Sequence, residues 1–261
     1  MLSAMKAITS EGVTVQSVDR ALHVLSYLAE HGATTVGDVA RVLGTHKSTA
    51  SRILATLEKR GFVQQEAERG KYRLGLSVVH LARAVTDDLE LVRYARPFCE
   101  QLSQETQETV NISVLNGDEV INIDQVIGPT SIVSVNWLGR RNSLSCTSTG
   151  KVLLAFMRGP EQHRLITKPL ERCTEHSILK FEVLEKQLTD IRQQGYAHTS
   201  EELELGMNAV AAPIWSFQAE VIAALSVSGP SYRMTKERIP ELGEAVKRAA
   251  LEVSEQLGFK D

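Results

Sequence analysis

The chain has 261 residues, of which 43% are hydrophobic, and its formal net charge is −3. This length allows two domains, and no apolar run is long enough to span a bilayer or to suggest a secretory signal. The three cysteines have no paired spacing, which fits a reducing cytoplasm, so we expect a cytoplasmic protein.

The charge is divided unevenly along the chain. Residues 1–86 contain 11 basic and 7 acidic residues, a net charge of +4, whereas the remainder contains 18 basic and 25 acidic residues, a net charge of −7. A basic surplus attracts phosphate, so we expect contact with nucleic acid only in the first third of the chain.

The N-terminal region begins with a segment that has no periodicity. Residues 1–14 are expected to be a loose tail. A helix is expected to follow, capped by Ser17 and ending near His31. Its inward-facing apolar residues are expected to be Val18, Ala21, Leu22, Leu25 and Leu28.

Residues 34–61 have the pattern of two short helices joined by a glycine turn. Thr35 and Asp38 have the spacing of a capping box, Gly44 ends the first helix, and Thr45 is expected to cap the second. In the second helix, apolar residues repeat at the spacing of a buried face. The opposite face carries Ser48, Ser51, Arg52, Ala55 and Lys59, with Lys47 beside it.

A hairpin is expected next, with strands at Phe62-Val63 and Tyr72-Arg73-Leu74 and a basic tip at Glu68-Arg69-Gly70-Lys71. Two short helices followed by such a hairpin are the parts of a winged helix-turn-helix, whose second helix enters the DNA major groove. An ordinary helical hairpin with a solvated charged face would show the same helix spacing. The hydroxyl and basic face and the hairpin favour DNA binding.

The rest of the chain mixes helices and strands. A linker helix at Leu76–Val85 could pair subunits or pack only against its own domain. Further helices are expected at 89–106, 147–156, 179–194 and 235–257, and strands at 109–115, 119–126, 132–135, 196–199, 209–215 and 221–227. The expected fold class is α+β: a winged helix-turn-helix over 15–76, a linker helix over 77–88, and a GAF-like sensor domain with a mixed sheet and flanking helices over 89–261.

Small polar residues gather where the helix at 147–156 begins, at Ser143, Ser145, Thr147, Ser148 and Thr149. A helix N-terminus presents unpaired N–H groups that favour a carboxylate or phosphate. Two serines, Ser226 and Ser228, would point to one face of a strand and complete a pocket. The alternative is that Ser148 or Thr149 only caps the helix, while the strand serines satisfy buried backbone.

Other reactive residues carry weaker signals. Cys173-Thr174-Glu175-His176, with His163, lacks paired metal-ligand spacing, so we expect no metal, and no cofactor motif is present. Cys146 has no histidine placed to activate it and is expected to pack or to line a pocket. Trp137 and Trp215 are expected in a core or an interface.

Several segments resemble the IclR family of bacterial transcription regulators in their order and spacing. They cover roughly residues 14 to 258. The segments are Val15-Gln16-Ser17-Val18-Asp19-Arg20-Ala21-Leu22, His46-Lys47-Ser48-Thr49-Ala50-Ser51-Arg52, Tyr72-Arg73-Leu74-Gly75, Gly150-Lys151, Gly195-Tyr196, Glu201-Glu202, Ala211-Ala212-Pro213 and Ala224-Leu225-Ser226-Val227-Ser228-Gly229-Pro230.

The resemblance implies a regulator rather than an enzyme. Such a protein would bind a pseudo-palindromic double-stranded operator, sense a small polar or anionic metabolite, and act as a homodimer or a dimer of dimers. The resemblance and the helix pattern together indicate that twelve residues contact DNA: Gln16, Ser17, Arg20, Thr45, Lys47, Ser48, Thr49, Ser51, Arg52, Lys71, Tyr72 and Arg73. For the effector it implies Ile132, Ser148, Thr149, Thr199, Ala209, Ser226 and Ser228.

The chain departs from the family pattern at two places. Relatives usually carry aspartates at Thr199-Ser200, and some carry cysteine at Ala209. These changes remove a charge and a thiol, so we hypothesise a small anionic or hydroxylated effector that need not be the 2-oxo acid of some members. The alternatives are an enzyme with an appended helical association domain and a DNA-binding protein without a ligand.

Overall fold

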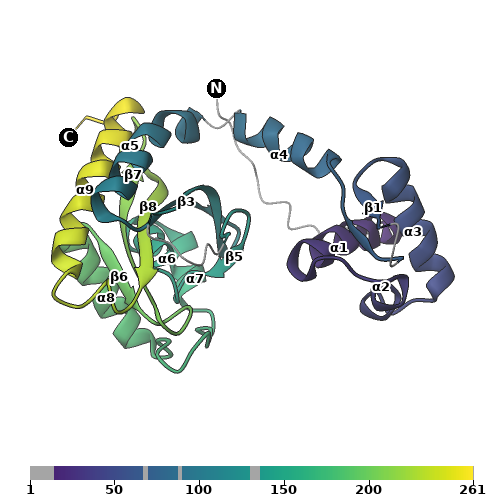
Figure 1. Cartoon of the computed structure of the whole chain (residues 1–261). Coiled ribbons are helices and arrows are strands. Elements are labelled where there is room, and N and C mark those ends of the chain that lie inside the picture. Colours follow the sequence, from purple (N-terminus) through teal and green to yellow (C-terminus); the bar gives the residue numbers. More distant parts are fainter. Residues whose placement is uncertain (1–14, 67–69, 88–89, 130–135, 261) are drawn as a thin grey trace. The chain divides into compact units, whose positions relative to one another are not determined.

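The computed structural model describes residues 15–66, 70–87, 90–129 and 136–260. The chain divides into two units, Met1–Asp88 and Leu89–Asp261 (Figure 1). In these described ranges, no helix is long and apolar enough to cross a membrane.

Unit 1 contains helices and a small hairpin. Its elements are α1 (Gln16–His31), α2 (Val36–Val42), α3 (Lys47–Lys59), β1 (Val63–Gln65), β2 (Tyr72–Leu74) and α4 (Ser77–Asp87). The first three helices bury Val24, Val39 and Leu54 in a common core. The two strands pair antiparallel, and two backbone hydrogen bonds between Thr34 and Tyr72 attach the hairpin to the segment before α2. The predicted order of a winged helix-turn-helix is confirmed.

The turn between α2 and α3 forms largely as predicted. The Thr35 hydroxyl accepts from the Asp38 N–H, and the Asp38 carboxylate accepts from the Thr35 N–H, which completes the capping box and lowers the pKa of Asp38. The predicted cap at Thr45 is wrong. The α3 N-cap is His46, because the Thr45 N–H donates to the Ala40 carbonyl and so still belongs to the end of α2.

The predicted inward face of α1 is wrong at two positions. Val18 is 55% exposed and Leu22 is 59% exposed, whereas Val24 and Leu28 are buried. Since α1 begins at Gln16 after Val15, Ser17 lies inside the first turn and does not cap it. The apolar pattern of α1 covers more of the helix surface than the core of unit 1 can bury, so one apolar side stays uncovered.

Unit 2 is built on a six-stranded sheet in the order β5-β4-β3-β8-β7-β6, in which every named pair is antiparallel. Its strands are β3 (Thr109–Asn116), β4 (Glu119–Val126), β5 (Arg141–Ser143), β6 (Ala197–Ser200), β7 (Met207–Trp215) and β8 (Val221–Pro230). The helices are α5 (Glu90–Thr106), α6 (Ser148–Phe156), α7 (Pro160–Ile166), α8 (Phe181–Gln194) and α9 (Ile239–Gln256).

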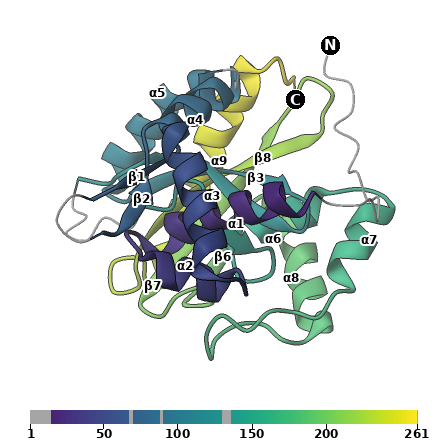
Figure 2. The ribbon, with the colours of Figure 1, turned by 90° about the vertical axis from the view of Figure 1, so that its right-hand side faces the viewer.

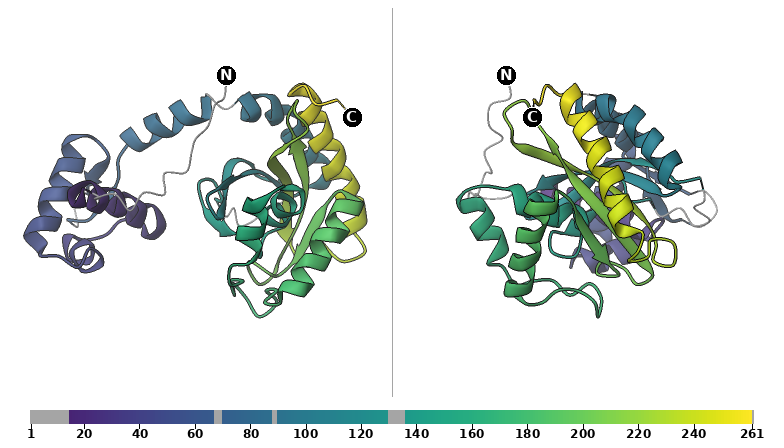
Figure 3. Two further views of the ribbon diagram at one scale, coloured as in Figure 1. Left: turned by 180° about the vertical axis from the view of Figure 1, so that it is seen from behind. Right: turned by 90° about the vertical axis from the view of Figure 1, so that its left-hand side faces the viewer.

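Helices cover both faces of this sheet (Figures 2 and 3). Helices α5 and α9 pack on one face, and α6, α7 and α8 pack on the other. Successive side chains of a strand point to opposite faces, so Val110 and Ile112 of β3 enter the α5–α9 core, while Asn111 and Ser113 face the α6 side. The α6 side of the sheet therefore carries polar residues near its centre, which marks it as the place to look for a site.

The predicted α+β fold is confirmed, and most predicted elements differ from the observed ones by a few residues. The strand expected at 132–135 lies outside the described residues. Two short elements, β5 and α7, were not predicted. Gly195 ends α8 in the left-handed conformation, with φ of 82°, as its position after the helix suggested.

Candidate functional site

The outer face of α3 carries short and basic side chains. Lys47, Ser48, Ser51, Arg52 and Lys59 are all exposed. The inner face buries Ala50, Leu54 and Leu57, and the first turn has no acidic residue. A helix with small hydroxyls and cations on its free side can enter a major groove without clashing with phosphates.

The remaining residues predicted to contact DNA occupy different environments. Gln16, Ser17 and Arg73 are exposed, whereas Arg20, Thr45, Thr49 and Lys71 are half-buried. The Tyr72 side chain is only 8% exposed and packs in the core of unit 1. This ring packs with residues of α1, α2 and α3 in that core, and the DNA contact predicted for Tyr72 stays a prediction.

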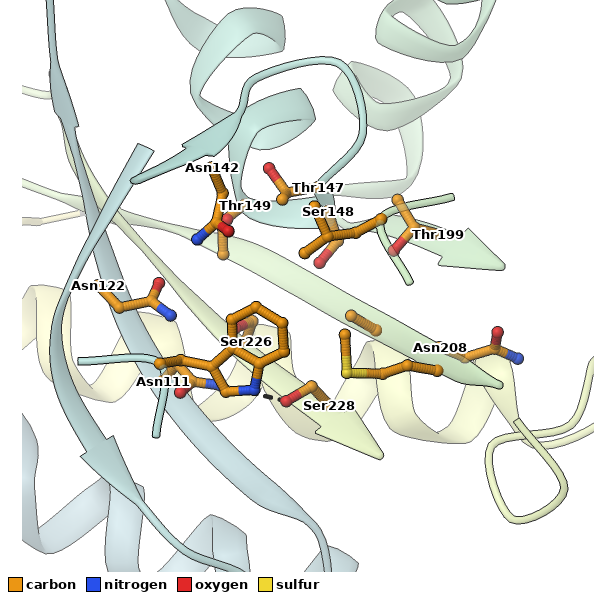
Figure 4. A pocket seen from close by; sticks show the side chains of 14 residues that line it. Asn111, Asn122, Asn142, Thr147, Ser148, Thr149, Thr199, Asn208, Ser226 and Ser228 are labelled. Atoms are coloured by element: carbon orange, nitrogen blue, oxygen red, sulfur yellow. Dashed lines mark hydrogen bonds between the residues drawn. The ribbon is translucent and has the colours of Figure 1, made fainter. Parts of the chain in front are cut away.

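Unit 2 contains a cavity of about 50 Å³ at the start of α6 (Figure 4). Six of the seven predicted effector residues line it: Ser148, Thr149, Thr199, Ala209, Ser226 and Ser228. The seventh, Ile132, lies outside the described residues. The other lining residues are Asn111, Asn122, Trp137, Asn142, Thr147, Leu203, Met207 and Asn208.

Every strand of the sheet contributes to this cavity. The lining residues follow the strand order, with Asn142 on β5, Asn122 on β4, Asn111 on β3, Ser226 and Ser228 on β8, Ala209 on β7 and Thr199 on β6. The pairs Asn111–Ser226 and Ala209–Ser228 are direct cross-strand neighbours. The sequence alternation predicted which side chains share a face, but it did not give this register, so the asparagines were missed.

The start of α6 is capped by Thr147. Its hydroxyl accepts from the Gly150 N–H at 3.1 Å and donates to the Ser143 carbonyl at 2.8 Å. The alternative that Ser148 or Thr149 only caps this helix is therefore wrong. A Cβ on Gly150 would lie 2.3 Å from the Leu144 carbonyl oxygen, so only glycine allows this close approach.

Four buried hydroxyls face the cavity without a partner. Ser148, Thr149, Thr199 and Ser226 are 2–6% exposed, and within the described part of the chain none of their hydroxyls forms a hydrogen bond. Among the described residues the fully enclosed unpaired side-chain atoms are Asp124 Oδ2 and Gln187 Oε1, so these four hydroxyl oxygens are open to the cavity. Four such groups in one cavity indicate a site that a polar ligand or water satisfies.

A buried ion pair joins two walls of the cavity. Lys151 Nζ lies 2.8 and 2.6 Å from the two carboxylate oxygens of Glu202, and these residues are 0% and 7% exposed. Burial lowers the pKa of Lys151 and raises that of Glu202, and their mutual attraction opposes both shifts. The pair links α6 to the segment that carries Leu203. Among the described lining residues, no side chain is charged.

The other reactive residues lie elsewhere. Cys146 is buried and its thiol donates to the Glu171 carbonyl at 3.3 Å, so it packs rather than lines the cavity. No group of three or more potential metal ligands occurs among the described residues. Trp137 lines the cavity, whereas Trp215 stacks on Phe259 and meets the Phe156 ring edge to face.

Known proteins match both units. A family model described as "Bacterial transcriptional regulator IclR C-terminal" matches residues 83–255, and the "IclR helix-turn-helix domain" matches residues 17–67. The chain belongs to the IclR family. The HTH-type transcriptional regulator XynR of Escherichia coli strain K12 is 32% identical, over 94% of this chain and 98% of its own length.

Solved structures of IclR proteins have the same fold. An IclR transcriptional regulator from Alicyclobacillus acidocaldarius has a TM-score of 0.82 at 28% identity, covering 94% of this chain and all of that one. An IclR homolog from Microbacterium hydrocarbonoxydans, complexed with 4-hydroxybenzoate, has a TM-score of 0.80 at 25% identity. The match covers 93% of this chain and 98% of that one. These relatives are named as regulators, and this IclR chain is a DNA-binding transcription regulator.

Proposed function

We propose that α3 of two subunits reads a pseudo-palindromic operator and that a small polar or anionic metabolite in the unit 2 cavity changes the affinity for DNA. The four unpartnered hydroxyls of the cavity carry this proposal, because all can donate and two of them, Ser148 and Thr149, lie at a helix N-terminus that also favours negative charge. A ligand that binds one arrangement of subunits more tightly shifts the population toward it. The protein would act on operator DNA in the cytoplasm.

The proposed DNA contacts divide by position. Lys47, Ser48, Thr49, Ser51 and Arg52 would meet bases and backbone from α3, where all but the half-buried Thr49 are exposed. The flanking residues Gln16, Ser17, Arg20, Thr45, Lys71 and Arg73 would contact phosphates. Phosphate contacts supply affinity and fix the register, whereas the α3 contacts supply sequence preference.

Arg52→Ala is expected to weaken operator binding by about 1–3 kcal/mol and to relax the preference at one base pair, if Arg52 reads a guanine. Fluorescence anisotropy with DNA from the protein's own upstream region measures the affinity, and a footprint locates the base pair. Arg158→Ala, which removes an exposed arginine of unit 2, is the control and should bind like the unmodified protein. An unchanged affinity and footprint for Arg52→Ala would remove Arg52 from the contacts.

Self-association is proposed through α1 and α4. Val18 and Leu22 on α1, and Leu76, Val79 and Leu81 at α4, are each more than half exposed. Exposed large apolar residues grouped on one helix can mark an interaction surface, and two half-sites require two copies of α3. Analytical ultracentrifugation of the full chain measures its oligomeric state, and a monomer at micromolar concentration would contradict the proposed self-association.

Ser226→Trp is expected to abolish the effect of the metabolite while operator binding stays intact, because the indole would fill a cavity of about 50 Å³. Ser226→Ala, which removes only the hydroxyl, should weaken the response without abolishing it. Gel shifts with the upstream DNA, with and without candidate acids, measure both effects. A folded Ser226→Trp protein that still responds would place the effector elsewhere, and a variant that unfolds would make Ser226 structural.

A further inference from the structure

Unit 2 contains a second pocket in addition to the cavity at the start of α6. Its volume is about 470 Å³, compared with about 50 Å³ for that cavity, and the two have no lining residue in common. The second pocket lies between the β3–β4 turn, β5, α6, α7 with the segment that follows it, and α8. It is a separate place for a ligand, and the proposed function does not use it.

A short segment separates the second pocket from the cavity. Residues 143–145 line the second pocket, whereas Asn142 and Thr147, on either side of them, line the cavity. The Leu144 backbone packs tightly on α6, since a Cβ on Gly150 would lie 2.3 Å from its carbonyl oxygen. This close packing holds the separating segment in place, so a ligand can occupy one space without entering the other.

The floor of the second pocket is aliphatic. Leu184 is fully buried and Leu154 is 2% exposed, and both belong to the core that α6, α7 and α8 share. The floor consists of Leu144, Leu154, Leu165, Ile166, Leu170 and Leu184. Pockets of this size with an apolar lining and a few polar groups are typical of small-molecule sites, and a hydrocarbon placed on such a floor is removed from water.

The charged residues that line the second pocket are mostly acidic. They are three acids, Asp118, Glu119 and Glu171, and one base, Lys168, so their net charge is −2. We call these four residues the rim. The ion pair between Lys168 and Asp118 lowers the pKa of Asp118, so this acid is ionised at neutral pH. Since the rim base is already paired, it attracts an anionic ligand less than a free ammonium group would.

Glu171 differs from the other two acids of the rim. Glu119 Oε2 lies 3.0 Å from Arg141 Nη1, whereas the Glu171 carboxylate forms no ion pair within the part of the chain that the structure describes. The position of Glu171 is fixed by its backbone, because its carbonyl accepts from the Cys146 thiol at 3.3 Å. An acid without a cation attracts a positively charged ligand and repels a negatively charged one.

We propose that the second pocket binds a small apolar amine, with its hydrocarbon body on the aliphatic floor and its ammonium group beside Glu171. The floor supplies most of the affinity through burial of apolar surface, and the rim supplies the preference for positive charge. This binding does not depend on the effector in the cavity or on the DNA contacts, so its failure would leave the proposed function standing.

Three probes with the same ring and the same number of carbons test the preference for charge. At neutral pH 2-phenylethylamine is a cation, 2-phenylethanol is neutral and phenylacetate is an anion. Titrations of the full chain followed by ligand-observed NMR measure their dissociation constants. The amine is expected to bind about two- to fivefold more tightly than the alcohol, as for an exposed ion pair, and phenylacetate should bind most weakly. The advantage of the amine should shrink at about 1 M salt, where exposed charges are screened.

Two glutamine variants test whether Glu171 causes this preference. Glu171→Gln removes the charge and keeps the shape, so the amine should bind no better than the alcohol, whose affinity should not change. Glu175→Gln is the matched control, because Glu175 is an exposed acid four residues further along that does not line the second pocket. It should bind all three probes like the unmodified protein. Both acids are exposed, so we expect both variants to fold.

Ser226→Trp distinguishes the second pocket from the cavity, because Ser226 lines only the cavity. The folded variant should bind the amine as the unmodified protein does, and loss of amine binding would place the amine in the cavity and overturn the proposal. A preference for the amine that survives Glu171→Gln would overturn it as well, even if Ser226→Trp did not fold. Equal binding of the three probes, or binding of none, would also show that the proposal is wrong.

Discussion

Lys151→Met is expected to destabilise unit 2 by about 3–5 kcal/mol, because it leaves the Glu202 carboxylate buried without its only cation among the described residues. Methionine nearly fills the space of the lysine chain, so the loss is electrostatic and not a packing defect. Both tryptophans of the chain, Trp137 and Trp215, lie in unit 2, and their fluorescence during urea unfolding reports on this unit alone.

The effect of this substitution should depend on pH. Burial already raises the pKa of Glu202, and without Lys151 the carboxyl in the folded protein lies further above its unfolded value. The folded state then binds a proton that the unfolded state releases, so the stability of the variant rises as pH falls through that pKa. The deficit relative to the unmodified protein should therefore narrow in acid, and a deficit that widens would contradict this account.

Two variants separate the buried pair from a general effect of lysine loss. Lys168→Met breaks an exposed ion pair with Asp118 and should leave the unfolding midpoint unchanged. The double variant Lys151→Met/Glu202→Leu removes both charges and should recover most of the loss. If the destabilisation of the double variant equalled the sum of those of Lys151→Met and Glu202→Leu, loss of the buried ion pair would not explain the instability of Lys151→Met.

Gly150→Ala is expected to destabilise unit 2 by about 3 kcal/mol or more, since a Cβ there meets the backbone of Leu144 at 2.3–2.7 Å and backbone atoms cannot rotate away. The start of α6 would have to move off the segment that carries Ser143 and Ser145. We therefore expect the variant to lose ligand binding even at temperatures where it remains folded. Urea unfolding followed by tryptophan fluorescence measures the stability.

Gly37→Ala in α2 is the control for this substitution. Its Cβ would meet nothing closer than 3.6 Å, and alanine favours a helix over glycine by about 0.5–1 kcal/mol. The urea midpoint of unfolding, followed by circular dichroism, should therefore be unchanged or slightly higher. A Gly150→Ala protein as stable as Gly37→Ala would show that α6 can shift without cost.

The sequence predicted those parts of the fold that local interactions determine. The capping box of Thr35 and Asp38, the end of α8 at Gly195 and the β3–β4 turn at Gly117 each depend on residues a few positions apart. The errors arose where distant parts decide the outcome. Val18 and Leu22 fit a helical stripe, but only the tertiary structure determines which stripe of α1 the core covers.

The sequence predicted only some of the residues that line the cavity. The residues at the start of α6 and the serines of β8 stand out as clusters of small polar side chains, whereas Asn122 and Asn142 are single polar residues within strands. Their convergence depends on the register of β4 with β3 and β5, including a bulge beside Ile112, and no local pattern specifies that register. The ion pair of Lys151 and Glu202, which are 51 positions apart, was hidden for the same reason.

The central seam of the cavity, where β3 meets β8, joins residues more than a hundred positions apart. During synthesis, the contacts within unit 1 can form early, whereas the cavity stays incomplete until Ser228 has left the ribosome. A chain interrupted before β8 would keep α3 but lack Ser226 and Ser228, so it could not form the cavity in which the effector is proposed to bind.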